Sequence, residues 1–333
     1  MYLKVGKGNA ERIRKMLISA GNFDISRKVM HRGEYVFFPV RKKLKIPGTK
    51  VAEIKGKAKK RKPRSLKEAL EGILTGEELK FVPTAFDVIG DIAVLEIPDE
   101  LKKKEKTIAE TLLRIFKNIR VVAKKRGSVE HEYRTRTVKV IGGEKRTQTV
   151  HREYGCFYKL DVSRAYFSPR LGTERMRIAS KVRKNERVLV MFAGVGPYAI
   201  LIAKNKKPKE VVAVELNPDA VRFMDENIKL NKVDVKSVRG DAKKVTPKLG
   251  KFDRIVMPLP LTASDFLDVA LPALKKNGTI HFYDFAHTKK EAEDKVKPIC
   301  DGLGHKIKIL ETVRCGSYSP CLSRFCVDFK KLA

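Results

Sequence analysis

Two glycines separated by one residue directly follow a run of apolar residues. The segment reads Val188-Leu-Val-Met-Phe-Ala-Gly-Val-Gly-Pro, so the glycines are Gly194 and Gly196. Consecutive apolar residues suit a buried parallel strand. Glycines let the backbone turn tightly and approach a ligand where a β-carbon would collide with it. The spacing predicts a strand, a ligand-binding loop that starts at Phe192, and a helix.

An acidic residue ends the next apolar segment. Glu215 closes Glu210-Val-Val-Ala-Val-Glu and is followed by Leu216. In a parallel sheet this carboxylate falls at the same edge as the glycine loop, where it can accept hydrogen bonds from two ribose hydroxyls. The two features together predict an adenosine ligand in contact with the loop, Glu215 and Leu216.

The glycine pattern also separates two classes of cofactor. A complete phosphate-binding loop reads Gly-x-Gly-x-x-Gly, but Ala199 stands at the third glycine position and Pro197 opens the helix. This disfavours a dinucleotide and favours S-adenosylmethionine, which has no phosphate. Because a lone Gly-x-Gly is a weak signal, an ordinary turn between strand and helix is the alternative.

Two further positions follow expected strands. Asp241 in Val238-Arg-Gly-Asp-Ala can reach an adenine amino group, or it can cap the helix that follows. Pro258 and Pro260 follow Phe252-Asp-Arg-Ile-Val-Met. Two prolines cannot continue a central strand, so the chain must leave the sheet there. We expect this rigid loop to form one wall of the site that holds the transferred methyl group and the acceptor base.

A polar and aromatic segment precedes the expected cofactor domain. It reads Tyr166-Phe-Ser-Pro-Arg-Leu-Gly-Thr-Glu-Arg and combines two aromatic side chains, two arginines and a carboxylate. This composition suits the stacking of a base and the handling of its proton. In the alternative interpretation, Tyr166 and Phe167 belong to the core, and Glu174 and Arg175 begin a solvated helix.

The elements that must position these residues alternate between strand and helix patterns from Leu171 onward. Such alternation predicts an α/β fold with a doubly wound parallel sheet. A helix near 65–74, a hairpin at 85–98, a helix at 107–119 and four later strands predict an α+β domain before it. The expected domains are a small basic domain (1–50), a basic linker (51–66), the α+β domain (67–165) and the sheet domain (166–333). The expected strands are 120–124, 134–141, 147–154, 157–162, 187–192, 210–215, 235–239, 252–257 and 278–283.

The charge indicates a polyanionic partner. The 333 residues include 73 Lys or Arg and 39 Asp or Glu, a net charge of +34. A heat-adapted surface would need both signs in similar numbers for ion-pair networks. Residues 1–66 alone carry 20 basic and 4 acidic side chains. The unpaired excess favours nucleic acid over membrane lipid.

Other classes of protein are disfavoured. The sequence has no run of about eighteen apolar residues and no signal-like N-terminus, so a cytoplasmic protein is expected. The five cysteines form no Cys-x-x-Cys pair, and no metal-ligand set is visible. We expect reduced thiols; a disulfide among Cys315, Cys321 and Cys326 is the alternative.

Taken together, these motifs resemble the archaeal tRNA (guanine-37-N1)-methyltransferase family. The resemblance rests on Tyr166–Arg175, Phe192-Ala-Gly-Val-Gly-Pro, Glu215-Leu-Asn-Pro and the hairpin around Phe86-Asp-Val-Ile-Gly-Asp, and it covers essentially the whole chain. It implies a class I methyltransferase fold, S-adenosylmethionine as donor and guanosine 37 of the tRNA anticodon loop as target. It also implies that the N-terminal domain contacts the tRNA elbow.

The resemblance also implies two catalytic residues. Guanine N1 must lose a proton before it becomes nucleophilic, and negative charge then develops on O6. By resemblance, Glu174 is the base, and Arg134 in Tyr133-Arg-Thr-Arg is the partner of O6. Tyr166 and Phe167, in the run that carries the resemblance, are expected to contact the cofactor.

The sequence departs from the family pattern at two positions. Val190 stands where an acid commonly ends the first strand, so a cofactor contact or a brace of the loop is missing. Pro258-Leu-Pro260 stands where many relatives have Asn-Leu-Pro. The proline variant is similar to a bifunctional branch that also methylates C7 of 4-demethylwyosine, so this second activity is a hypothesis.

Two other functions stay open. A related transferase of the wyosine pathway moves the aminocarboxypropyl group of the same cofactor on a similar scaffold. A non-catalytic tRNA-binding protein would also explain the charge and Val190. Against the latter, Glu174, Glu215 and Asp241 are all present where a catalyst would need them. A monomer is expected, since one chain can span a tRNA.

Overall fold

The computed structural model describes residues 1–24, 26–54, 63–126, 137–319 and 321–332. The chain divides into two compact units, Met1–Arg64 and Ser65–Ala333. The predicted class, an α/β sheet domain with a preceding α+β segment and a small basic N-terminal domain, is confirmed. Within the described residues, none of the helices is long and apolar enough to cross a membrane.

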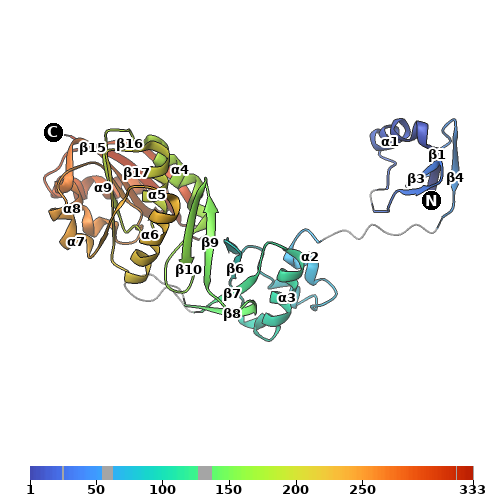
Figure 1. Cartoon of the computed structure of the whole chain (residues 1–333), viewed down its shortest axis with the longest axis horizontal. Helices are drawn as coiled ribbons and strands as arrows, with labels where there is room; N and C mark the ends of the chain where they lie inside the picture. The colour runs from blue at the N-terminus through green and yellow to red at the C-terminus, as the bar shows by residue number, and fades with distance from the viewer. Residues whose placement is uncertain (25, 55–62, 127–136, 320, 333) are drawn as a thin grey trace. The chain divides into compact units, whose positions relative to one another are not determined.

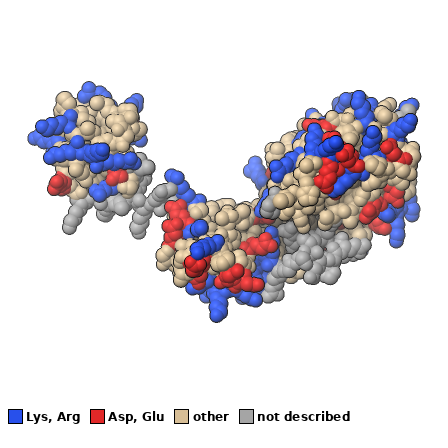
Figure 2. All heavy atoms as spheres, turned by 180° about the vertical axis from the view of Figure 1, so that it is seen from behind, with Lys and Arg blue, Asp and Glu red and all other residues tan. Residues whose placement is uncertain are grey.

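The N-terminal unit is a four-stranded antiparallel sheet with one helix. The sheet has the order β2-β3-β1-β4. Ile13 and Leu17 of the helix pack with Leu3 and Phe38 of the sheet in one buried cluster. On the face shown in Figure 2, Lys and Arg side chains form a band across the unit and further groups at its edges. The elements are β1 (Tyr2–Gly6), α1 (Ala10–Ser19), β2 (Met30–Arg32), β3 (Tyr35–Pro39) and β4 (Thr49–Ala52).

The second unit begins with a four-stranded sheet of order β5-β6-β7-β8. β5 and β6 form the predicted hairpin, which turns at Gly90 and Asp91, and β6 pairs in parallel with β7. Ile108 and Leu112 of α3 are buried with Leu95 and Val122 of the sheet. The elements are α2 (Leu66–Leu70), β5 (Asp87–Ile89), β6 (Ile92–Leu95), α3 (Glu105–Ile115), β7 (Val121–Arg126) and β8 (Thr137–Gly143).

A separate antiparallel hairpin follows, formed by β9 (Gln148–Glu153) and β10 (Cys156–Asp161). Its turn consists of Tyr154 and Gly155, both with positive φ. Two asparagines of α6 (Pro218–Asn231) hold β10 by side-chain bonds to its backbone, Asn227 at Lys159 and Asn231 at Phe157. These bonds join the hairpin to the sheet domain (Figure 1).

The sheet domain is built on seven strands in the order β13-β12-β11-β14-β15-β17-β16. The five predicted strands are present and pair in parallel. The last two strands were not predicted; β17 runs antiparallel to both β15 and β16. The strands are β11 (Arg187–Met191), β12 (Glu210–Glu215), β13 (Lys236–Arg239), β14 (Phe252–Met257), β15 (Leu274–Ala286), β16 (Ile307–Ser317) and β17 (Ser323–Lys331).

Helices cover both faces of this sheet. Val188 and Val190 of β11 belong to the cluster that contains Ile178, Ile200 and Phe223 of α4, α5 and α6. The intervening Leu189 and Met191 belong to the opposite cluster, with Leu267 of α8 and Val296 of α9. The alternation along β11 therefore separates two apolar layers. The remaining helices are α4 (Gly172–Lys181), α5 (Pro197–Lys206), α7 (Ala242–Val245), α8 (Leu267–Ala273) and α9 (Lys289–Gly302).

Candidate functional site

The predicted cofactor loop joins β11 to α5 at the carboxyl edge of the sheet. Phe192, Gly194 and Gly196 have φ of 55°, 56° and 86°. A side chain at Gly196 would place its β-carbon 3.0 Å from Ile200 and Met224. Phe192 is not a glycine, so its left-handed conformation costs about 1 kcal/mol or more. Its ring packs edge-on against Phe266, with 4.8 Å between ring centroids. The loop is therefore a strained turn held open by packing.

Glu215 braces this loop. One carboxylate oxygen, Oε2, accepts a 2.7 Å hydrogen bond from the Gly194 N–H. The other, Oε1, accepts from the N–H groups of Leu216 (2.9 Å) and Asn217 (2.8 Å). Burial raises the pKa of Glu215, and the backbone bonds oppose that rise. Since a carboxylate offers about four acceptor positions, donors of the described residues fill three and leave one on Oε2, fewer than the two that bonds from two ribose hydroxyls would need.

Val190 fits this arrangement. It is fully buried in β11, between Ala213 of β12 and Val256 of β14. The brace that an acid at this position was expected to supply comes instead from Glu215, across the gap between neighbouring strands. The loop is therefore held without an acid at position 190.

Asp241 lies at the same edge, beyond the end of β13. It is the N-cap of α7, and its Oδ1 accepts a 2.9 Å hydrogen bond from the Lys243 N–H. The Gly240 N–H donates to the backbone oxygen of Glu215, which keeps the two loops adjacent. The capping role that was left as an alternative is thus present in this structure.

The two prolines turn the chain out of the sheet as expected. β14 ends at Met257, and the Leu259 N–H donates a 2.8 Å hydrogen bond back to the Met257 carbonyl. Pro260 is buried, whereas Leu261 is exposed. Since β14 pairs directly with β11, the proline loop lies beside the cofactor loop.

Tyr166 and Phe167 point to different surroundings. Tyr166 is 42% exposed, and its backbone oxygen lies 3.6 Å from where a Gly194 β-carbon would be. Phe167 is buried, with its ring centroid 5.0 Å from that of His151 and the Arg175 guanidinium 5.0 Å from its own. Of the two aromatics, Tyr166 borders the cofactor loop and Phe167 belongs to the core.

Glu174 is buried in the first turn of α4, with 6% of its surface exposed. The Tyr283 hydroxyl donates to Oε1 at 2.6 Å. Arg177 donates from Nη2 to Oε1 at 2.8 Å and from Nε to Oε2 at 2.7 Å. The Tyr198 hydroxyl donates to that of Tyr283 at 3.1 Å, so the network reaches the first turn of α5. The alternative of a solvated helix start is therefore wrong.

Of the two residues predicted to be catalytic, Glu174 and Arg134, the structure places Glu174 in this buried network. The neighbouring Arg175 turns away from Glu174 and binds both carboxylate oxygens of Glu153, at 2.8 Å and 2.5 Å. It is therefore a structural partner of the β9–β10 hairpin. Arg134 lies outside the described residues. Tyr283 and Arg177 were missed by the sequence reasoning, although Arg177 stands one helical turn after Glu174.

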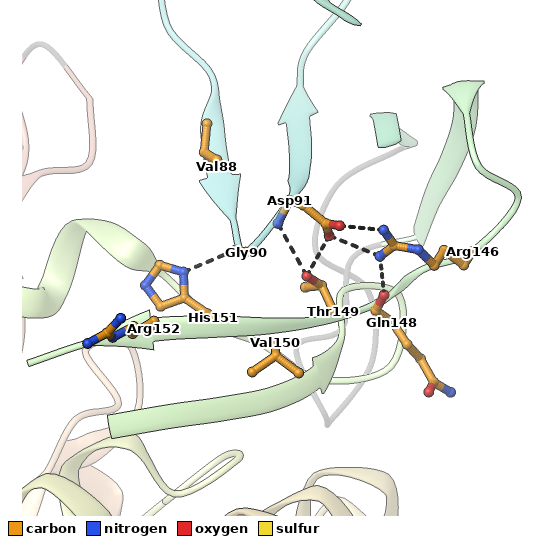
Figure 3. A pocket seen from close by; sticks show the side chains of 9 residues that line it. All are labelled: Val88, Gly90, Asp91, Arg146, Gln148, Thr149, Val150, His151 and Arg152. Atoms are coloured by element: carbon orange, nitrogen blue, oxygen red, sulfur yellow. Dashed lines mark hydrogen bonds and ion pairs between the residues drawn. The ribbon is translucent and has the colours of Figure 1, made fainter. Parts of the chain in front are cut away.

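A cavity of about 670 Å³ lies where the β5–β6 turn meets β9 (Figure 3). The Asp91 carboxylate accepts two bonds from Arg146, at 3.0 Å and 2.5 Å, and one from the Thr149 hydroxyl at 2.8 Å. The Gly90 N–H donates to His151 Nδ1 at 3.1 Å. Bonding to Arg146 lowers the pKa of Asp91, which stays ionised. These bonds fasten the α+β segment to the hairpin, and no predicted cofactor residue lines the cavity.

The cysteines and the metal candidates can be placed as well. All five cysteines are free, as predicted. Among the described residues, His281, Cys326 and Asp328 form a buried group with its ligand atoms within 4.8 Å. His281 Nδ1 bonds to Asp328 at 2.6 Å, and its Nε2 bonds to Arg254 at 2.7 Å. Both ring nitrogens are occupied, so the group is a hydrogen-bonded network.

Comparison with protein families assigns three segments of the chain. Residues 149–310 match the TRM5/TYW2 methyltransferase domain. Residues 66–147 match the TYW2 N-terminal domain, and residues 3–47 match the tRNA methyltransferase 5 N-terminal domain. The first of these matches begins at β9, in keeping with the attachment of the hairpin to α6.

Individual proteins match over most of the chain. Trm5b of Pyrococcus abyssi, named tRNA (guanine(37)-N(1))-methyltransferase, is 38% identical over 99% of this chain and 98% of its own. Its crystal structure covers 100% of this chain and 99% of its own, with a TM-score of 0.88 and 37% identity. A structure of aTrm5 in complex with tRNALeu covers 99% of both chains, with a TM-score of 0.84 and 31% identity.

Relatives from the wyosine pathway match as well. Taw22 of Nanoarchaeum equitans, named tRNA (guanine(37)-N(1))/4-demethylwyosine(37)-methyltransferase, is 34% identical over 65% of this chain and 89% of its own. Two curated aminocarboxypropyltransferases match 60% and 81% of this chain. The comparisons thus cover each of the catalytic functions considered above.

Proposed function

Because the chain belongs to the TRM5/TYW2 methyltransferase family, which uses S-adenosylmethionine, we propose that it methylates N1 of guanosine 37 in tRNA. The observation that carries the proposal is the buried carboxylate of Glu174. It is tied through Tyr283 and Tyr198 to the helix that starts at the cofactor loop. A proton acceptor beside a methyl donor site is what this reaction requires.

The residues at the carboxyl edge of the sheet fit S-adenosylmethionine. Glu215 has one acceptor position left for the ribose, and the positive φ of Gly194 and Gly196 keeps the loop backbone open to a ligand. Tyr166 borders the same loop with an exposed ring. When bound, the cofactor supplies a methyl group on a positively charged sulfur. We propose Phe192, Leu216, Asp241, Pro258 and Pro260 as further contacts.

The proposed step couples loss of the N1 proton to transfer of the methyl group. Guanine N1 loses its proton to Glu174, and its electron pair forms a bond to the methyl carbon. The bond between that carbon and sulfur breaks, and its electrons stay on sulfur as a neutral thioether. Charge that develops on O6 needs a cationic partner, and we assign Arg134 to this role by family resemblance. Alignment of the methyl group with N1 supplies much of the rate.

We further propose that the two units bind different parts of one tRNA. The N-terminal unit carries a large share of the basic excess and would bind the elbow, while the second unit would bind the anticodon loop. Phosphate contacts of this kind give affinity that falls with salt. The protein would act as a monomer in the cytoplasm, where tRNA is modified.

A second activity is favoured by one observation. By family resemblance, Pro258 stands where many relatives have an asparagine, so position 258 offers neither a side-chain donor nor an acceptor beside the expected base position. A less polar wall suits a tricyclic base. We propose that the protein also methylates C7 of 4-demethylwyosine, the activity that appears in the name of Taw22.

One experiment tests both activities. The protein is incubated with labelled S-adenosylmethionine and tRNA-Phe that is either unmodified or carries 4-demethylwyosine, and nucleosides are then analysed by mass spectrometry. We expect 1-methylguanosine from the first and a methylated tricycle from the second. An added aminocarboxypropyl group would assign the related transferase reaction instead. If neither tRNA is changed although the cofactor binds, the protein is a binding protein.

A further inference from the structure

The carboxylate of Glu174 is part of a buried network that reaches residues inside β15 and β17. Arg177 bonds to Glu174 with two nitrogens and also bonds to Asp328, with Nη1 2.7 Å from Oδ2. Asp328 is 1% exposed and accepts further bonds from Lys181 and His281. Arg177 therefore bridges two buried carboxylates.

The hydrogen bonds to Glu174 are unevenly divided between its two oxygens. Among the hydrogen bonds of the described residues, Oε1 accepts from both Tyr283 and Arg177, whereas Oε2 accepts from the Nε of Arg177. Since each carboxylate oxygen offers about two acceptor positions, these donors fill Oε1 and leave a position on Oε2. The thiol of Cys315 lies beside the same carboxylate, but a thiol is a weak donor.

The network combines ionised groups of both signs with buried groups that stay neutral. Among the described residues, its basic members are Arg177, Lys181 and Arg254, and its acidic members are Glu174, Asp328, Glu186 and Glu311. Burial lowers the pKa of His281, which is thus neutral near pH 7. Burial likewise raises the pKa of Tyr283, Tyr198, Cys315 and Cys326, which stay protonated.

From this geometry we infer that Arg177, Tyr283 and Asp328 are positioning residues, which present Oε2 of Glu174 as the atom that accepts the proton of the substrate base. Asp328 holds Arg177 in place whether Glu174 is ionised or protonated, because its own bonds to the guanidinium do not involve Glu174. This inference rests on the proposed function, in which Glu174 is the base.

The network predicts opposite effects for two substitutions. Asp328→Asn removes a negative charge beside Arg177, so the guanidinium has Glu174 as its remaining carboxylate partner in this pair. The stronger interaction makes Glu174 a weaker proton acceptor. Tyr283→Phe removes a donor to Oε1 and makes it a stronger one. In the pH profile of single-turnover methyl transfer, the acid limb should move to lower pH in Asp328→Asn and to higher pH in Tyr283→Phe. Each shift should be about half to one pH unit.

The experiment uses the full chain, labelled S-adenosylmethionine and an unmodified tRNA transcript with guanosine at position 37. Binding of the cofactor and of the tRNA shows that each variant is folded. Asp328→Glu, which keeps the charge, should restore the wild-type limb. Asp253→Asn is the control. Asp253 also accepts hydrogen bonds, from the backbone N–H of Arg187 and from the Lys275 ammonium, but it lies at the amino-terminal end of β14, outside the Glu174 network.

The outcomes are distinguishable. Opposite shifts in the two variants, with the control unchanged, support the inference. Slower transfer with an unmoved acid limb in both variants would show a purely structural role and overturn it, while the role of Glu174 would stand. Full activity of Glu174→Gln would instead overturn the assignment of the base itself.

Discussion

The hydroxyl of Tyr283 donates a 2.6 Å hydrogen bond to Oε1 of Glu174, although the two residues are 109 positions apart in the sequence. Tyr283 comes from the middle of the sheet and Glu174 from the first turn of a helix that precedes it. The bond fixes the carboxylate of a buried acid in a network that reaches Tyr198 of α5 on one side and Asp328 of β17 on the other.

Replacing Glu174 with Gln should abolish most methyl transfer. The amide keeps the volume and can keep some of the bonds to Arg177 and Tyr283, but it cannot take the proton from N1. The single-turnover rate near neutral pH should fall roughly 100-fold or more. Affinity for S-adenosylmethionine, measured by calorimetry, should change little. A rate equal to that of the wild type would remove Glu174 from the mechanism.

The network should also make stability depend on pH. Burial alone would raise the pKa of Asp328, but bonds from His281 and Arg177 outweigh it and hold the pKa well below its ordinary 3.8. The native state thus binds this proton less readily than the unfolded chain. The stabilisation is present above about pH 4 and is lost as the pH falls further.

In Asp328→Asn, the free energy of unfolding should therefore fall less steeply as the pH is lowered. At neutral pH it should lower the free energy of unfolding by about 3 kcal/mol, because one partner of a buried ion pair is removed. Denaturant unfolding between pH 3 and 7 measures both effects. Asp284→Asn is the contrast, since burial raises the pKa of Asp284. An equally steep acid dependence in Asp328→Asn would contradict the linkage.

Gly196→Ala should weaken cofactor binding more than it weakens the fold. The residue has φ of 86°, and a β-carbon would lie 3.0 Å from side-chain atoms of Ile200 and Met224, so these side chains or the loop must give way. Gly155→Ala is the control, because Gly155 has φ of 75° but nothing within 4 Å. Left-handed strain costs about 1–2 kcal/mol in both variants. Only Gly196→Ala should raise the Kd for S-adenosylmethionine; equal affinities would mean that the loop does not bind the cofactor.

Removing residues 1–64 should reduce tRNA affinity and its dependence on salt. These residues form a compact unit with their own core, so the remaining chain keeps the sheet domain intact. Fewer phosphate contacts release fewer counterions, so the plot of log K against log salt should become less steep. Cofactor affinity should be unchanged. An unaltered slope would place the main RNA surface on the second unit.

Much of the fold follows from local sequence patterns. The five parallel strands were predicted because each is a short apolar run between helical segments, as in Val188–Met191 and Val211–Val214. The antiparallel strands β16 and β17 were missed. In β16 the register shifts at Ile309 and again at Arg314, so the alternation of buried and exposed residues that would reveal a strand is broken.

The sequence by itself determined which chemical groups are present and at which edge of the sheet they lie. These are a glycine loop, an acid after the second strand and a proline turn after the fourth, all at the carboxyl ends of parallel strands. Only the tertiary structure decided which groups meet. Glu215 braces Gly194, and Tyr283, Arg177 and Asp328 surround Glu174. Such pairings depend on strand order and on the direction of side chains across distant elements, and local spacing carries no record of either.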